Sequence, residues 1–252
     1  MIHVDALSKS FHDRKRGTIK AVSNLSFDVA AGEIFGLLGP NGAGKTTTLR
    51  LLATVLRPSS GSATICGIDL VHDPDRARRR LGFLSGDMGH YGRLTPRQAL
   101  MFFGRLNGVS KPELGRRAAE LLHRFDLDSV ADVKTDKLST GMKQRLAIAR
   151  CVVHDPPVLI LDEPSAGLDV PGARSMEQFI LEQKNAGKSI VFSSHVMEEA
   201  EYLCDRIAVV NQGELKVVGT MAELKALTGR TRLREVFLDL IGLTPEAKGV
   251  HA

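Results

Sequence analysis

The sequence predicts an α/β fold with a parallel core sheet, an antiparallel β piece near its start and an inserted helical subdomain. Short, continuous apolar runs at 33–39, 157–161 and 189–192 are typical of strands that are buried on both faces. Segments with helical spacing lie between these runs, and such alternation indicates a parallel sheet with right-handed crossovers. From about residue 87 to about residue 155 the pattern changes to helices, which predicts the inserted subdomain.

The first seventy residues are expected to supply the antiparallel piece and the start of the core sheet. The alternating stretches 2–7 and 25–30 predict two strands, joined by a polar connection at 12–18. The first apolar run then predicts a buried strand, and residues 45–56 carry apolar side chains at helical spacing. Turn and strand signals return at 57–70.

Helix start signals mark the inserted subdomain. Thr95 is the predicted N-cap, Pro96 occupies the first helical position, and Gln98 completes a capping box. Ser110 and Glu113 repeat this scheme for the next helix. Because a capping box satisfies backbone N–H groups at a helix start, both helices are expected to begin at these residues.

The C-terminal half continues the alternation of strands and helices. A helix is expected at 173–188, with a stop at Gly187, and a strand, turn and strand at 206–219. Residues 1–220 are expected to form one domain, and residues 221–252 a short C-terminal helical extension.

Composition limits the classes of partner. The 252 residues include 34 Lys and Arg and 29 Asp and Glu, a net charge of +5, and no Trp. This balance argues against a nucleic-acid partner. Cys66, Cys151 and Cys204 are widely spaced and are expected to be free thiols. No signal-peptide pattern opens the chain, and no run reaches the roughly 18 apolar residues of a membrane span. A membrane role would therefore come through another polypeptide.

Residues 39–46 read GPNGAGKT and fit the phosphate-binding pattern G-x-x-x-x-G-K-[ST] between a buried strand and a helix. Glycines let successive backbone N–H groups point at phosphate oxygens, and the helix N-terminus adds about half a positive charge. Lys45 adds a charge for the β and γ phosphates, and Thr46 can ligate Mg²⁺. The predicted nucleotide-binding residues are Gly39, Pro40, Asn41, Gly42, Ala43, Gly44, Lys45, Thr46 and Thr47.

Two carboxylates follow the second apolar run. Asp162 ends this run, where a carboxylate is costly unless a cation or hydrogen-bond donors satisfy it. Holding Mg²⁺, directly or through water, explains its position. Glu163 is expected to point in a different direction, where it can orient or deprotonate an attacking water. A carboxylate that merely caps the following turn would explain one of these residues more easily than both.

A second serine and glycine turn, LSTGMKQR at 138–145, opens another helix. An ordinary capped helix explains Ser139 but does not explain why Gly141 interrupts the first turn. A GTPase or kinase is disfavoured as well, because the N-K-x-D guanine motif does not occur in the sequence and neither class explains this segment.

These motifs, with SAGLD at 165–169 and His195 after FSS, resemble in order and spacing the ATP-binding subunits of ABC transporters. The resemblance covers residues 1 to about 220 and implies the P-loop NTPase fold of ABC type, with ATP and Mg²⁺ as cofactors. It implies that two such domains meet head to tail. Each ATP then lies between the phosphate loop of one domain and Ser139 and Gly141 of the other, which contact the γ-phosphate.

The resemblance also implies roles for single residues. His195 would contact the γ-phosphate and steady Glu163, and Asp169 would cross the dimer interface. Phe11 would stack on adenine, with Val22 flanking it, although a core phenylalanine is an alternative interpretation. The catalytic residues implied are Lys45, Glu163 and His195.

One segment departs from the family pattern. After the strand LGFL the family usually places a glutamine that reaches Mg²⁺ and reports to the membrane domain. This sequence has Gly86 at that position and Asp87 beside it. The hypothesis is that Asp87 approaches Mg²⁺ or its water shell.

The stretches 82–97 and 8–22 resemble ATP-binding subunits of bacterial sodium-extrusion exporters, and 233–242 resembles the tail of exporter-type subunits. This implies an ATP-hydrolysing subunit at the cytoplasmic face of the bacterial membrane. It would power a separate polytopic transmembrane permease that exports sodium, another small cation or a drug. The second ATP-binding subunit would be an identical copy or a similar chain. The alternative is an ABC-type ATPase that regulates a non-transport membrane partner or a cell-division partner.

Overall fold

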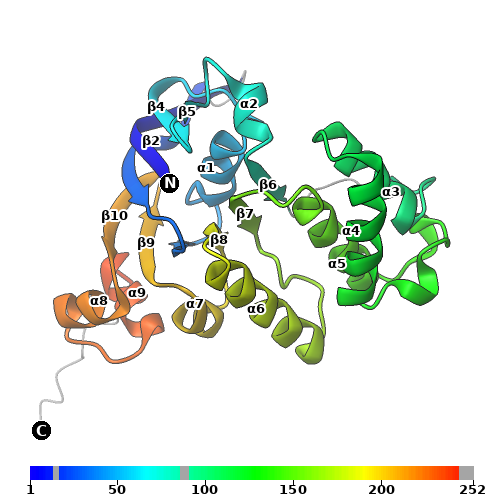
Figure 1. Ribbon diagram of the computed structural model, residues 1–252. Helices are drawn as coiled ribbons and strands as arrows, with labels where there is room; N and C mark the ends of the chain where they lie inside the picture. Colours follow the sequence, from blue (N-terminus) through cyan, green and yellow to red (C-terminus); the bar gives the residue numbers. More distant parts are fainter. Residues whose placement is uncertain (14–16, 86–90, 244–252) are drawn as a thin grey trace, which may run out of the picture.

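The computed structural model describes residues 1–13, 17–85 and 91–243 and confirms the α/β fold (Figure 1). In this described part, the core sheet has six strands and is parallel except at β10, which pairs antiparallel with β9. The order across the sheet is β10 (Glu214–Gly219), β9 (Arg206–Asn211), β3 (Ile34–Leu38), β8 (Ser189–Ser193), β7 (Val158–Asp162) and β6 (Leu81–Leu84). The three apolar runs form β3, β7 and β8, at the centre of this sheet.

The described residues also form a four-stranded antiparallel sheet. Its order is β2 (Gly17–Val29), β1 (Ile2–Asp13), β4 (Ser60–Ile65) and β5 (Ile68–Asp69). The first two strands are longer than predicted, because they stay paired as far as Asp13 and Gly17, inside the expected polar connection. Side chains at that end are exposed. Backbone pairing there needs no apolar alternation, so the sequence pattern did not reveal it.

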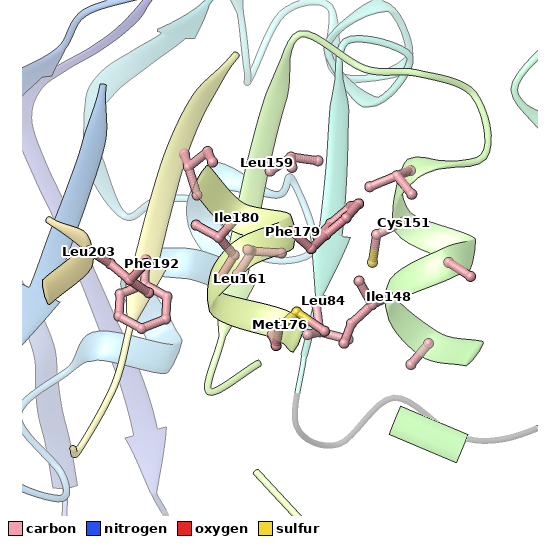
Figure 2. Close-up of a cluster of buried hydrophobic side chains, with 14 of the residues drawn as sticks. Leu84, Ile148, Cys151, Leu159, Leu161, Met176, Phe179, Ile180, Phe192 and Leu203 are labelled. Atoms are coloured by element: carbon pink, nitrogen blue, oxygen red, sulfur yellow. The ribbon is translucent and has the colours of Figure 1, made fainter. Parts of the chain in front are cut away.

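Alternate residues of the core strands enter two hydrophobic clusters on opposite faces of the sheet. In β7, Leu159 and Leu161 belong to the first cluster, and Val158 and Ile160 belong to the second. Figure 2 shows Leu159 and Leu161 among side chains of α5 and α6. The first cluster includes residues of α5 (Thr140–Val152), α6 (Val170–Asn185) and α7 (Met197–Leu203). The second includes residues of α1 (Lys45–Leu52), α2 (Pro74–Arg78) and the antiparallel sheet.

The helices expected between the strands at 81–84 and 158–162 are present. They are α3 (Pro96–Leu106), α4 (Lys111–Arg124) and α5, with short 3-10 turns at Asp128–Val130 and Thr135–Lys137. The capping box of α3 is confirmed. The Gln98 N–H donates to Thr95 Oγ1 at 3.2 Å, and the Thr95 N–H donates to Gln98 Oε1 at 3.0 Å.

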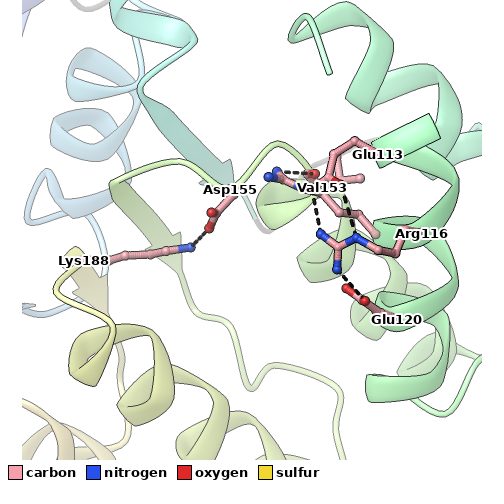
Figure 3. A network of polar contacts seen from close by, with 7 residues as sticks. Glu113, Arg116, Glu120, Val153, Asp155 and Lys188 are labelled. Atoms are coloured by element: carbon pink, nitrogen blue, oxygen red, sulfur yellow. Dashed lines mark hydrogen bonds and ion pairs between the residues drawn. The ribbon is translucent and has the colours of Figure 1, made fainter. Parts of the chain in front are cut away.

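The capping box predicted for α4 is wrong. Ser110 is the N-cap residue, but its side chain accepts no cap hydrogen bond. Glu113 instead accepts hydrogen bonds from Arg116 Nη2 at 2.7 Å and from Arg117 Nε at 2.6 Å (Figure 3). The guanidinium groups of Arg116 and Arg117 lower the pKa of Glu113 to about 2. This carboxylate therefore pairs one turn further along the helix and does not reach back to Ser110.

The C-terminal extension is helical where the structure describes it, and it packs on the core. It forms α8 (Met221–Thr228) and α9 (Leu233–Leu240), and Leu224, Leu233 and Val236 are buried in the first cluster. The last part of the predicted extension, 244–252, lies outside the described residues. None of the helices in the described ranges has both the length and the apolar composition that a membrane span requires.

Candidate functional site

The loop 39–44 joins the end of β3 to the start of α1. The main chains of β2 and β9 pack closely against this loop. Gly44 has a φ of 101°, and a Cβ there would lie 2.3 Å from the carbonyl oxygen of Ala21 on β2. A Cβ on Gly39 would lie 2.3 Å from the carbonyl oxygen of Val210 on β9. Since neither position has room for a side chain, the loop requires glycine at both.

Replacing Gly44 with alanine is expected to destabilise the fold, because the added methyl group meets the Ala21 carbonyl and the backbone is left-handed. Gly187→Ala is the matched control: Gly187 has a φ of 84°, with open space around its Cβ. The control should lower the free energy of unfolding by about 1–2 kcal/mol from backbone conformation alone. Gly44→Ala should lower it further. Urea unfolding measures both variants, and equal losses would contradict the steric argument.

Lys45 opens α1, and the loop holds its ammonium group. Nζ donates hydrogen bonds to the carbonyl oxygens of Gly39 at 2.6 Å and Pro40 at 3.1 Å. Burial lowers the pKa of Lys45, while the negative charges of Glu163 and Asp162 act in the opposite direction. The two carboxylates therefore help to keep this ammonium charged, as a point charge for phosphate must be.

A cavity of about 180 Å³ lies at this loop and is here called the loop cavity. Residues 41–47, all predicted to bind nucleotide, line it together with Ala21 and Glu163. Gly39 and Pro40 do not line it but fix Lys45. The loop cavity lies at the N-terminus of α1, where backbone N–H groups and the helix dipole favour an anion.

Asp162 and Glu163 leave the end of β7 in different environments. Asp162 is 5% exposed, and its Oδ1 accepts a hydrogen bond from Ser193 Oγ at 2.5 Å. Glu163 has a φ of 50°, and its N–H donates to the carbonyl oxygen of Ser193 at 3.1 Å. Its side chain is 38% exposed. The left-handed turn at Glu163 therefore separates a buried carboxylate from an accessible one.

His195 lies beside Glu163, with 3.2 Å between His195 Nδ1 and Glu163 Oε1. Both residues line a second cavity, of about 260 Å³, here called the histidine cavity. Among the residues that the structure describes, Glu163 alone lines both the loop cavity and the histidine cavity. A carboxylate at this junction can act on a water beside a phosphate group while the imidazole fixes its direction.

The residues present fit a Mg²⁺ ion that binds together with a nucleotide. Thr46 brings a hydroxyl group to the loop cavity, and Asp162 brings a buried carboxylate next to Glu163. The described residues contain no group of three or more His, Cys, Asp or Glu that could hold a metal alone. Mg²⁺ suits this arrangement because proteins often hold it by one or two carboxylates, waters and substrate phosphates. Gly86 and Asp87, the other part of this prediction, lie outside the described residues.

Ser139 and Gly141 line a third cavity, of about 440 Å³, here called the signature cavity. Ser139 is the N-cap of α5, and its Oγ accepts a hydrogen bond from the Met142 N–H at 3.2 Å. A Cβ on Gly141 would lie 3.8 Å from its nearest neighbour, the carbonyl oxygen of Gly167, which is an ordinary contact. Nothing in the described part of this chain therefore requires a glycine at position 141.

Asp169 lines the same signature cavity. It is the N-cap of α6, and its Oδ1 accepts a hydrogen bond from the Gly172 N–H at 3.0 Å. Among the described residues, the linings of the signature cavity and the loop cavity have no member in common. One chain by itself thus keeps its two predicted phosphate-binding segments in separate cavities.

Phe11 and Val22 differ in exposure. Phe11 is 40% exposed on β1, with Lys9 Nζ 5.3 Å from its ring centroid, so the alternative of a core phenylalanine is wrong. An exposed ring remains able to stack on a base. Val22 is 1% exposed and belongs to the second hydrophobic cluster. Its side chain therefore cannot flank a base, because it faces the core, and its neighbour Ala21 lines the loop cavity instead.

Sequence reasoning missed two polar residues of the site. Ser193 lies opposite Asp162 in the register of β7 and β8. Its position at the end of the third apolar run was the available signal in the sequence. The sequence does not reveal that β7 and β8 are neighbours in the sheet, so the contact with Asp162 could not be predicted. Glu199 on α7 is 6% exposed and lines the histidine cavity. No spacing in the sequence marks it.

Comparisons with known proteins agree with this geometry. A family model described as ABC transporter matches residues 22–166. The chain is 38% identical over 240 residues to the ABC transporter ATP-binding protein NatA of Bacillus subtilis (strain 168), and the match covers 95% of this chain and 97% of that protein. It is 40% identical over 219 residues to the daunorubicin/doxorubicin resistance ATP-binding protein DrrA of Streptomyces peucetius, with 85% and 65% covered.

Solved structures are similar over nearly the same length. An ATP-binding subunit of an ABC transporter has a TM-score of 0.88 at 29% identity, and the match covers 96% of this chain and 99% of that one. The ATP-binding cassette MJ0796, solved as a dimer in a post-hydrolysis state bound to ADP and Pi, has a TM-score of 0.81 at 26% identity, with 88% and 99% covered.

Proposed function

Because this chain belongs to the ABC transporter family as an ATP-binding and ATP-hydrolysing subunit, we propose that two copies of it form a head-to-tail motor. This motor works at the cytoplasmic face of the membrane, beneath a separate polytopic permease. It powers the export of sodium, another small cation or a drug.

The separation of the loop cavity from the signature cavity carries this proposal. The triphosphate of ATP needs hydrogen-bond donors around its γ-phosphate, and the loop cavity offers them from one side. In a head-to-tail pair, the signature cavity of the second copy faces the same phosphate. Ser139 and Gly141 then contribute a second helix N-terminus. A glycine at position 141, which this chain's own packing does not need, lets the phosphate approach closely.

Residues of the loop cavity and the histidine cavity have different roles in the proposed hydrolysis of ATP. Lys45 and the N–H groups of residues 41–47 bind the phosphates, and Phe11 stacks on the base. Glu163 orients the attacking water and accepts its proton, and His195 holds the Glu163 carboxylate and contacts the γ-phosphate. Mg²⁺, when bound through Thr46 and Asp162, neutralises charge on the phosphates.

Two observations support export and narrow the cargo. The stretches 82–97 and 8–22 resemble the ATP-binding subunits of sodium-extrusion exporters, which favours sodium or a similar cation. The similarity to a daunorubicin/doxorubicin resistance protein favours a drug as the second class of cargo.

Asp169 lines the signature cavity, and it is the residue that we expect to reach across to the second copy.

Efflux from cells tests the export proposal. Cells that carry Lys45→Ala as their sole copy of this chain should retain loaded radioactive sodium, because the motor cannot bind its phosphates. Cells with the wild type should extrude it. Lys216→Ala, which removes an exposed lysine of β10, is the control and should behave as wild type. Rubidium and daunorubicin, loaded in parallel, distinguish the other cargo classes. Equal efflux of all three in Lys45→Ala and wild-type cells would contradict export.

A further inference from the structure

Glu199 is a buried carboxylate beside the histidine cavity, and no role described above uses it. It lies on α7 and is 6% exposed. One of its oxygens accepts a hydrogen bond from the Ser165 hydroxyl. The other accepts a hydrogen bond from the Ser194 hydroxyl at 2.5 Å. The Glu199 side chain thus connects two loops that are far apart in the sequence.

The two serines flank the pair that is proposed to act on water. Ser194 directly precedes His195, and its Oγ also accepts a hydrogen bond from the Val196 N–H at 3.0 Å. The turn that carries His195 is therefore held on both sides of the histidine. Ser165 follows Glu163 by two residues, in the loop 163–169 that leads to Asp169. Glu199 consequently fixes both ends of the contact between Glu163 and His195.

A buried carboxylate of this kind has an unusual set of partners. In the described part of the chain, the hydrogen-bond donors to the Glu199 carboxylate are two neutral hydroxyl groups. Burial of a carboxylate without a cation is costly, so apolar packing alone would favour another side chain here. The position calls for two acceptors at a fixed spacing, one for each loop, which a carboxylate supplies and most side chains do not.

The loop that carries Ser165 also reaches the signature cavity. Gly167 lines both the histidine cavity and the signature cavity, and Asp169 lines the signature cavity. A shift of this loop on contact with a second copy would therefore move Ser165, and through Glu199 it would move Ser194 and the turn at His195. The hydrogen bonds form a physical connection between the predicted dimer contact and the hydrolytic pair.

We propose that Glu199 is a positioning residue, whose two hydrogen bonds hold Glu163 and His195 in place and couple them to the loop 163–169 at the dimer contact. This inference rests on the proposed function, in which Glu163 activates water and two copies share the nucleotide. It adds that hydrolysis depends on a carboxylate that acts through the hydroxyl groups of Ser165 and Ser194.

The test compares Glu199→Ala and Glu199→Gln with Glu198→Gln, which changes the exposed neighbouring carboxylate on the same helix. Glu199→Ala should lower kcat by about tenfold to a hundredfold, the range expected when a reacting group is misplaced by about an ångström. The KM for ATP should stay within about twofold, since the loop cavity is untouched. Glu199→Gln should recover part of kcat, because its amide oxygen still accepts one hydroxyl. Glu198→Gln should match the wild type.

Single hydroxyl removals keep the test decisive even if Glu199→Ala folds poorly. Ser165→Ala and Ser194→Ala should each lower kcat, and the two changes together should lower it further than Glu199→Gln does, because glutamine keeps one of the two hydrogen bonds. Unchanged kcat in Glu199→Gln and in both serine variants, or a loss of thermal stability alone, would overturn the inference. The proposed function fails separately: in that case the wild type would not dimerise with ATP, or Glu163→Gln would hydrolyse ATP normally.

Discussion

Replacing Glu163 with glutamine is expected to lower ATP turnover by about a hundredfold to ten-thousandfold, the contribution of a positioned general base. Glutamine has nearly the same shape and can still contact His195 Nδ1, which lies 3.2 Å from the carboxylate. It cannot accept the proton of an attacking water. Because the phosphate loop is unchanged, ATP should bind with wild-type affinity and remain uncleaved.

The same variant should collect as an ATP-bound dimer. If the γ-phosphate holds two copies together, its persistence shifts the population from monomer to dimer. Phosphate release measures the turnover, and analytical ultracentrifugation with ATP and with ADP measures the mass. Glu198→Gln, on the exposed side of α7, is the control and should hydrolyse and dissociate as the wild type does. A Glu163→Gln chain that stays monomeric at saturating ATP would contradict the shared nucleotide.

Gly141→Asp is expected to abolish ATP-driven dimerisation and to lower turnover by about a hundredfold or more, as loss of a preorganised donor site does. The new carboxylate would project from the first turn of α5, where a second copy's γ-phosphate is expected, and like charges would repel. The fold should tolerate it, since a Cβ at this position makes only a contact of 3.8 Å. The affinity of the single chain for ATP should stay unchanged, because in the described part of the chain the loop cavity and the signature cavity have separate linings.

Gly115→Asp is the matched control, because Gly115 too is a helical glycine, and beyond its own helix backbone no described atom lies within 4 Å of an added Cβ. It should dimerise and hydrolyse ATP normally. Calorimetry gives the ATP affinity of each variant, and ultracentrifugation gives the mass. Mixing Gly141→Asp with Lys45→Ala should restore part of the turnover, since one intact shared site forms in each mixed dimer. Weaker ATP binding by monomeric Gly141→Asp would instead place position 141 beside its own chain's nucleotide.

The strands and helices of the core could be predicted from the sequence, because apolar runs and capping residues are signals between residues close together in the chain. Residues 158–161, which form β7 together with Asp162, are all apolar and buried, as expected for a central parallel strand. The Thr95 box was predictable because, among the described residues, the Gln98 side chain bonds only the N-cap residue. The Ser110 box failed because Glu113 had two arginines within reach on its own helix, a competition that a pattern of single letters does not weigh.

The parts of the site that could not be predicted depend on tertiary neighbours. Val22 was expected beside the base, but the irregularity of β2 at Asn24, which has a φ of 51°, breaks the alternation and turns Val22 into the core. Ser193 bonds Asp162 only because β7 and β8 are adjacent in the sheet. Glu199 gathers hydroxyl groups from two separate loops, so no spacing could reveal it. Motif residues close together in the chain were predictable, whereas the groups that orient them come from distant segments.

Main-chain atoms of neighbouring segments pack tightly against the phosphate loop. The Ala21 carbonyl oxygen lies 2.3 Å from the position that a Cβ on Gly44 would take, and the Gly213 N–H donates to the carbonyl oxygen of Ala43 at 3.0 Å. A phosphate loop held by these contacts is expected to move little by itself. On the proposed function, in which two copies enclose each nucleotide, ADP is then released when the copies separate, and that separation paces the cycle.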